Sequence, residues 1–112
     1  MKAGRLLSSD EELWELACYH FHQVAEKSLK GFLASLDIRV PRTHDLEELV
    51  GRCAEQDVDF LTLQDAALYL EPFYIEPRYP VLSPLELSIE RLKAAEEAAR
   101  RINSLVADKV GP

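Results

Sequence analysis

The feature that most constrains the fold is an apolar stripe that recurs at helical spacing through residues 9–36. Its members lie four and three residues apart: Trp14, Cys18, Phe21, Ala25, Leu29, Phe32 and Leu36. This spacing places them on one face of an α-helix. Ser9 and Glu12 form a capping box before the stripe, and Gly31 within it indicates a close crossing by another helix. The pattern predicts one amphipathic helix of about seven turns.

Three further segments have helical patterns. The first covers about residues 44–55, with Thr43 as its N-cap, and the second covers about residues 59–70. The last begins at Ser83-Pro84, where a capping Ser precedes a Pro at the first helical position. Apolar residues then recur at helical spacing almost to the end of the chain.

Strand patterns are missing from the sequence. No segment alternates with period two, and Pro72, Pro77 and Pro80 exclude an interior strand from the connection before the last helix. We therefore predict an all-α fold, an antiparallel bundle of about four helices with short connections. The length of 112 residues leaves no room for a second core, so residues 1–112 are predicted to form a single helical domain.

Charge and cysteine content limit the classes of function. The net charge of −7 argues against broad adhesion to nucleic acid or anionic membranes, although 13 Lys and Arg leave room for a local basic site. Cys18 and Cys53 lack the spacing of a zinc site or a disulfide framework, so we expect two free thiols in a reducing compartment. No leader peptide or membrane span is evident, and the expected location is cytoplasmic.

Metal binding and complete catalytic sets find no support in the spacing. His20 and His22 lie two residues apart on a helix and point about 200° from each other, so they cannot share one ion. His22, Glu26 and Lys30 follow at intervals of four and are expected to form a solvated, ion-paired face. Glycine-rich phosphate loops and Asp-x-Asp pairs are also missing. We predict no metal, no cofactor and no enzyme complete within this chain.

Two polar clusters remain as candidate sites. Basic residues around Arg42 and His44 precede the helix at 44–55, whose free N–H groups and dipole would help to hold a phosphate. The alternative is that Thr43 caps this helix while His44 bonds within the fold. The second cluster holds Arg78 and Tyr79, because Arg and aromatic rings can grip a phosphate and stack on a base. Equally, Arg78 could pair with a carboxylate of the bundle.

At these residues the chain resembles the HEPN family, the helical domain named for higher eukaryotes and prokaryotes nucleotide binding. Three blocks match in order: ACYHFHQVAEKSLKG at 17–31, PRTHDL at 41–46 and IEPRYP at 75–80. The similarity covers roughly residues 3–105 and implies an antiparallel up-down bundle of four to five helices that usually forms a homodimer. Only residues 3–7 could represent the family's first helix, so this helix is expected to be short. It also implies a small nucleotidyltransferase as partner in a toxin–antitoxin or stress system, with a nucleotide or RNA as ligand.

The resemblance does not extend to the family's ribonuclease motif. Active members are metal-independent ribonucleases that use an Arg, four to six residues and then a His. Counting from Arg78, that His should fall at 83, 84 or 85, where this sequence has Ser, Pro and Leu. The same spacing occurs between Arg39 and His44, but in a different loop, where chance readily supplies it.

Three hypotheses follow. The first is a non-catalytic HEPN protein in which Arg78 and Tyr79 contact a phosphate or base, assisted by Lys27, Arg42 and His44. The second is a metal-independent endoribonuclease toxin in which His44 supplies the histidine that pairs with Arg78. The third is a structural interaction module whose charged faces are simply solvated.

Overall fold

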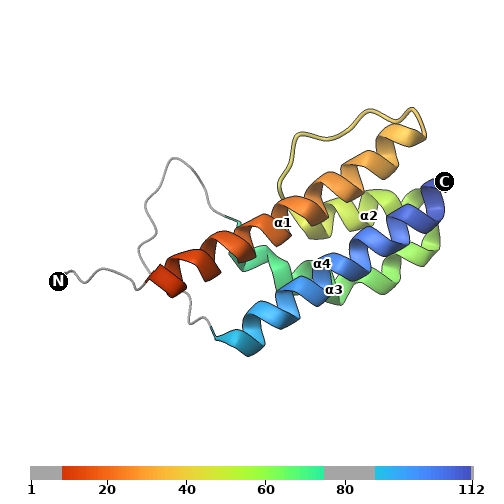
Figure 1. The fold of residues 1–112 in the computed structure, drawn as a ribbon. Helices are drawn as coiled ribbons and strands as arrows, with labels where there is room; N and C mark the ends of the chain where they lie inside the picture. The colour runs from red at the N-terminus through yellow and green to blue at the C-terminus, as the bar shows by residue number, and fades with distance from the viewer. Residues whose placement is uncertain (1–8, 75–87, 112) are drawn as a thin grey trace.

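The computed structural model describes residues 9–74 and 88–111, which form four α-helices packed side by side (Figure 1). The helices are α1 (Ser9–Ser35), α2 (Leu46–Gln56), α3 (Gln64–Leu70) and α4 (Ile89–Val110), with the 3₁₀ turns η1 (Val58–Leu63) and η2 (Glu71–Phe73) on either side of α3. No strand occurs in these two described ranges. The predicted all-α class is therefore confirmed.

The long helix α1 matches the predicted span and ends in a well-defined cap. The N–H of Ile38 donates to the carbonyl of Leu33 at 3.1 Å, and that of Asp37 donates to the carbonyl of Ala34 at 2.9 Å. Asp37 adopts a positive φ of 62°. This pair of bonds around a left-handed residue is a Schellman motif, which closes the helix and turns the chain away from it.

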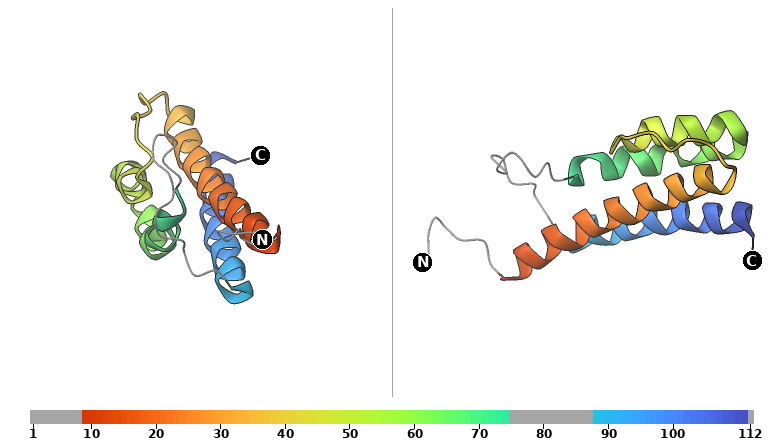
Figure 2. Two further views of the ribbon diagram at one scale, coloured as in Figure 1. Left: turned by 90° about the vertical axis from the view of Figure 1, so that its left-hand side faces the viewer. Right: turned by 90° about the horizontal axis from the view of Figure 1, so that it is seen from above.

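The helix directions differ from the expected strict alternation of up and down. In Figures 1 and 2, α1, α2 and α4 run in one direction and α3 runs against them. Side-chain contacts agree, since Ser28 of α1 bonds Asn103 of α4, whereas Tyr69 and Arg91 meet across the antiparallel pair α3 and α4. The reason is the connection at 36–45, which runs back along the bundle so that α2 starts beside the middle of α1.

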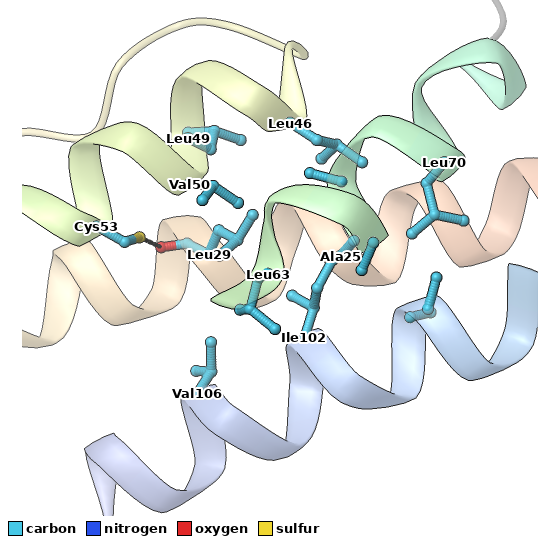
Figure 3. Packing of buried hydrophobic residues seen from close by; sticks show 14 of the residues in the cluster. Ala25, Leu29, Leu46, Leu49, Val50, Cys53, Leu63, Leu70, Ile102 and Val106 are labelled. Carbon is cyan, nitrogen blue, oxygen red and sulfur yellow. Dashed lines mark hydrogen bonds between the residues drawn. The ribbon is translucent and has the colours of Figure 1, made fainter. Parts of the chain in front are cut away.

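One apolar core joins all four helices (Figure 3). Residues that are completely buried in it include Leu29, Leu46, Val50, Phe60, Leu70 and Ile102. The thiol of Cys53 donates to the carbonyl of Leu29 at 3.5 Å inside this core. Burial of each large apolar side chain contributes about 1.5–3 kcal/mol, so packing supplies most of the stability of these amphipathic helices.

Several predicted details are corrected. Asp45, not Thr43, is the N-cap of α2, and its side chain accepts from the N–H of Glu48. The described part of α4 begins at Ile89 with Ser88 as its N-cap, whereas the predicted start at Ser83-Pro84 lies outside the described residues. Gly31 is exposed, and a Cβ built on it would meet nothing within 4 Å, so none of the described helices crosses there.

None of the described helices carries an apolar stretch long enough to cross a bilayer.

Candidate functional site

Polar side chains converge where the start of α2 and the end of η2 meet the middle of α1. We refer to His22, Glu26, His44, Glu71 and Tyr74 as the polar cluster. Glu26 and His22 come from α1, whereas His44 belongs to the connection at 36–45. Glu71 begins η2, and Tyr74 directly follows it. Three segments distant in sequence are therefore joined here.

Glu26 is the anchor of the polar cluster. Its carboxylate is buried, and Oε2 accepts a hydrogen bond from Lys30 Nζ at 2.9 Å. His44 Nδ1 lies 2.9 Å from Oε2 and 3.1 Å from Oε1. Burial opposes ionisation of this group, but the hydrogen bonds from Lys30 and His44 outweigh it and lower the pKa of Glu26. Glu26 is therefore a buried carboxylate that stays charged, with two cationic or polar partners.

His44 is the part of the polar cluster most open to solvent. Its side chain is 55% exposed, and its ring stacks on that of Tyr74 with centroids 4.6 Å apart and planes 16° apart. Because Nδ1 faces the Glu26 carboxylate, that nitrogen carries a proton and Nε2 is directed elsewhere. An imidazole held in this way can accept a proton at Nε2, and in its protonated form it can donate from Nε2 to a phosphate.

His22 has the opposite environment. It is completely buried, with Nδ1 3.9 Å from Glu26 and Nε2 3.8 Å from Glu71. Burial lowers the pKa of His22, and the Glu26 charge offsets this only in part. The predicted solvated face was therefore wrong for His22 and Glu26, because the chain from His44 to Tyr74 covers this part of α1.

The start of α2 is occupied by carboxylates. Asp45 Oδ1 accepts from the N–H of Glu48 at 3.2 Å, and Glu71 Oε2 accepts from the N–H of Glu47 at 3.3 Å. Burial and the hydrogen bond with Asp45 raise the pKa of Glu71 to about 7, whereas the same bond lowers the pKa of Asp45. A phosphate at this helix end would have to displace these side chains, since they already use its free N–H groups.

Of the other four residues in the sequence hypotheses, only Lys27 and Arg42 lie within the described part of the chain. Lys27 is exposed on α1 immediately after Glu26, and Arg42 is exposed two residues before His44. Arg78 and Tyr79 lie outside the described residues. The described part of the chain thus brings His44 to Glu26, with Tyr74 as the ring on which His44 stacks. Lys27 and Arg42 are close to these residues in sequence and make no described contact with them.

Sequence reasoning missed the roles of Glu26, His22 and Glu71. The spacing of four between Glu26 and Lys30 correctly indicated their contact. Nothing local indicated that the connection at 36–45 would fold back and bury Glu26. Glu71 directly follows the predicted helix at 59–70, and no pattern in the sequence indicated that its side chain would reach the start of the helix at 44–55.

Comparison with protein families agrees with the all-helical fold. The model of the HEPN domain matches residues 1–109, nearly the whole chain. The chain belongs to the HEPN family. For this HEPN chain, a comparison with curated proteins and another with solved structures give no significant match. Membership in this family associates the helical bundle with nucleotides or RNA.

Proposed function

We propose that this HEPN protein binds a nucleotide or RNA at the polar cluster and does not itself cleave RNA. It would act as a cytoplasmic component of a toxin–antitoxin or stress system, together with a small nucleotidyltransferase. The observation that carries the proposal is His44, an exposed imidazole that is fixed by Glu26 and stacked on Tyr74. In its protonated form, such a group offers a hydrogen bond to a phosphate beside an aromatic ring.

The position of Tyr74 links this site to the remaining candidate residues. Arg78 follows Tyr74 by four residues and Tyr79 by five. Arg42 and Lys27 add positive charge on the other two segments of the polar cluster. Together they support a local basic site on a chain with a net charge of −7.

The residues after Arg78 support the non-catalytic part of the proposal. Positions 83, 84 and 85 hold Ser, Pro and Leu, none of which can act as the acid or base that a ribonuclease histidine supplies. Binding without cleavage needs only the cationic and aromatic groups.

A homodimer belongs to the same proposal. Leu13 and Leu16 on the first part of α1 are 61% and 60% exposed. Neighbouring exposed leucines form the kind of apolar surface that a second subunit buries.

Binding is tested with a fluorescent ATP analogue and with a labelled ten-nucleotide single-stranded RNA. The proposal predicts saturable binding of one probe, weakened at least ten-fold by Arg78→Ala and by His44→Ala. Arg100→Ala is the matched control, because Arg100 is an exposed arginine whose ion pairs among the described residues are with Glu96 and Glu97 of its own helix. No binding of either probe at millimolar concentration would favour a purely structural interaction module.

A metal-independent endoribonuclease is the second candidate. It is favoured by the contact of the Glu26 carboxylate with His44 Nδ1, since a carboxylate commonly orients a histidine for proton transfer. In this function, His44 would act on RNA together with Arg78, in the same chain or across a dimer.

RNA incubated with the protein in EDTA separates the two functions. The non-catalytic proposal predicts no cleavage above the buffer control at high protein concentration. A cleavage rate that falls about 10²–10⁴-fold in His44→Ala and by a similar factor in Arg78→Ala would establish the ribonuclease instead.

A further inference from the structure

The strongest unexplained feature is a buried histidine that faces a group of carboxylates. In residues 9–74 and 88–111, neither ring nitrogen of His22 makes a hydrogen bond of good geometry, although the side chain is completely buried. The nearest backbone partner is His44, whose weaker contact raises the pKa of His22 slightly against the effect of burial. Buried polar atoms are nearly always paired, so an imidazole without a well-formed hydrogen bond calls for an explanation. Nε2 is the nitrogen that faces Glu71, 3.8 Å from Oε1.

The carboxylates lie close enough together to share an ion. One oxygen each of Asp45, Glu47 and Glu71 lies within 4.8 Å of the other two. Bonds of Glu71 Oε2 and Asp45 Oδ1 to the first N–H groups of α2 occupy only one oxygen of each side chain. Glu71 also shares a hydrogen bond with Asp45, and an ion that binds both carboxylates would replace that bond.

These observations point to one new site. We infer that His22 Nε2 and Glu71 Oε1 bind a divalent transition-metal ion. Asp45 and Glu47, which lie close to Glu71 but form no such group with His22 among the described residues, would move toward the ion as its further ligands. Ligands of a tetrahedral ion lie about 3.4 Å apart when the bonds are about 2.1 Å long. The 3.8 Å between His22 and Glu71 therefore needs a shift of only a few tenths of an ångström. The site would tie α1, the start of α2 and η2 together.

The surroundings of His22 fit a metal ligand in a second respect. Nδ1 lies 3.9 Å from the buried carboxylate of Glu26. A histidine that binds a metal through one nitrogen usually presents the other to a carboxylate, which fixes the ring and its tautomer. One imidazole with several carboxylates suits Zn²⁺ or Mn²⁺ better than Mg²⁺ or Ca²⁺, which prefer oxygen ligands alone. This inference departs from the sequence expectation of no metal, which considered only His20 with His22.

Calorimetric titration of the untagged, EDTA-treated full chain with ZnCl₂, MnCl₂ and MgCl₂ tests the site. We expect one Zn²⁺ or Mn²⁺ per chain and no comparable binding of Mg²⁺. His22→Phe, which keeps an aromatic ring against Tyr74, should weaken binding at least ten-fold. Glu71→Gln should do the same while keeping an oxygen for the N–H of Glu47. His20→Gln is the control, because His20 is exposed and lies two residues away.

A direct readout keeps the test valid if His22→Phe folds poorly. The ring nitrogens of His22 in the unmodified protein can be followed by NMR during the ZnCl₂ titration, and Nε2 should shift at one equivalent. The site would be overturned if Glu71→Gln bound the metal as tightly as the unmodified chain does. It would also be overturned if the metal bound without moving the His22 ring signals. No nucleotide or RNA is present, so the result is separate from the proposed function.

Discussion

At the scale of single residues, His44 and His22 have opposite environments. His44 is open to solvent and bonded to a carboxylate, whereas His22 is buried without hydrogen bonds of good geometry among the described residues. The difference comes from the chain that packs over α1. It gives His44 the properties of a binding residue and makes His22 sensitive to protonation.

The lowered pKa of His22 has a defined effect on stability. Below the ordinary pKa of 6.5, His22 is protonated in the unfolded chain but not in the folded chain. The free energy of unfolding therefore decreases as pH falls below 6.5. Glu71 acts in the opposite sense. Its pKa is about 7 in the folded chain against 4.5 when unfolded, so its contribution is complete below 4.5 and is lost as pH rises through 7.

Glu71→Gln removes the opposing effect and exposes that of His22. In EDTA, we expect the free energy of unfolding of Glu71→Gln to fall between pH 7 and 5, with a slope approaching about 1.4 kcal/mol per pH unit. The double variant Glu71→Gln with His22→Phe should lack this slope. Urea unfolding at several pH values measures it, and equal slopes in both proteins would contradict the assignment to His22.

Asp37 offers a prediction that is independent of the site. Its φ of 62° at the end of α1 is a conformation that glycine adopts without steric cost. Asp37→Gly should therefore raise the free energy of unfolding by roughly 0.5–1 kcal/mol. Thermal unfolding checks this, with Asp65→Gly as a control that should destabilise, because Asp65 lies within α3. A lower melting temperature for Asp37→Gly would contradict the Schellman geometry.

At the scale of elements, the start of α4 distinguishes the structure from the sequence expectation. Ser88 has extended φ and ψ, and its Oγ accepts from the N–H of Arg91 at 3.1 Å. Loss of such a cap costs about 1 kcal/mol, so Ser88→Ala should destabilise the protein by roughly that amount. Ser104→Ala, within the same helix and exposed, should cause no loss. Equal effects of the two substitutions would argue against a cap at Ser88.

Helix positions were predictable from the sequence, but helix directions were not. The stripe from Cys18 to Phe32 identified the buried face of α1 because the helical period depends only on local spacing. The path of residues 36–45 depends on what α2 packs against, which local pattern does not contain. The same connection brings His44 to Glu26, so the arrangement of the candidate site was equally out of reach.

At the scale of the whole molecule, the buried thiols report opening of the core. Burial raises the pKa of Cys53 to about 12 and also raises that of Cys18, although Arg91 lowers the latter in part. Both thiols should therefore react with a disulfide reagent at pH 8 at least 10³-fold more slowly in the folded chain than in urea. Absorbance of the released thiolate measures the rates. Fast reaction of two thiols per folded chain would contradict the core described for Cys18 and Cys53.

The central claim is that this HEPN protein binds a nucleotide or RNA at the polar cluster. Its most direct test is an NMR titration of the ¹⁵N-labelled full chain with ATP and with the ten-nucleotide RNA in EDTA. The account predicts shifts of the amide signals of Lys27, Arg42, His44 and Tyr74, with those of Glu97 and Arg100 on α4 unchanged. No shifts at millimolar ligand, or shifts confined to α4, would contradict it.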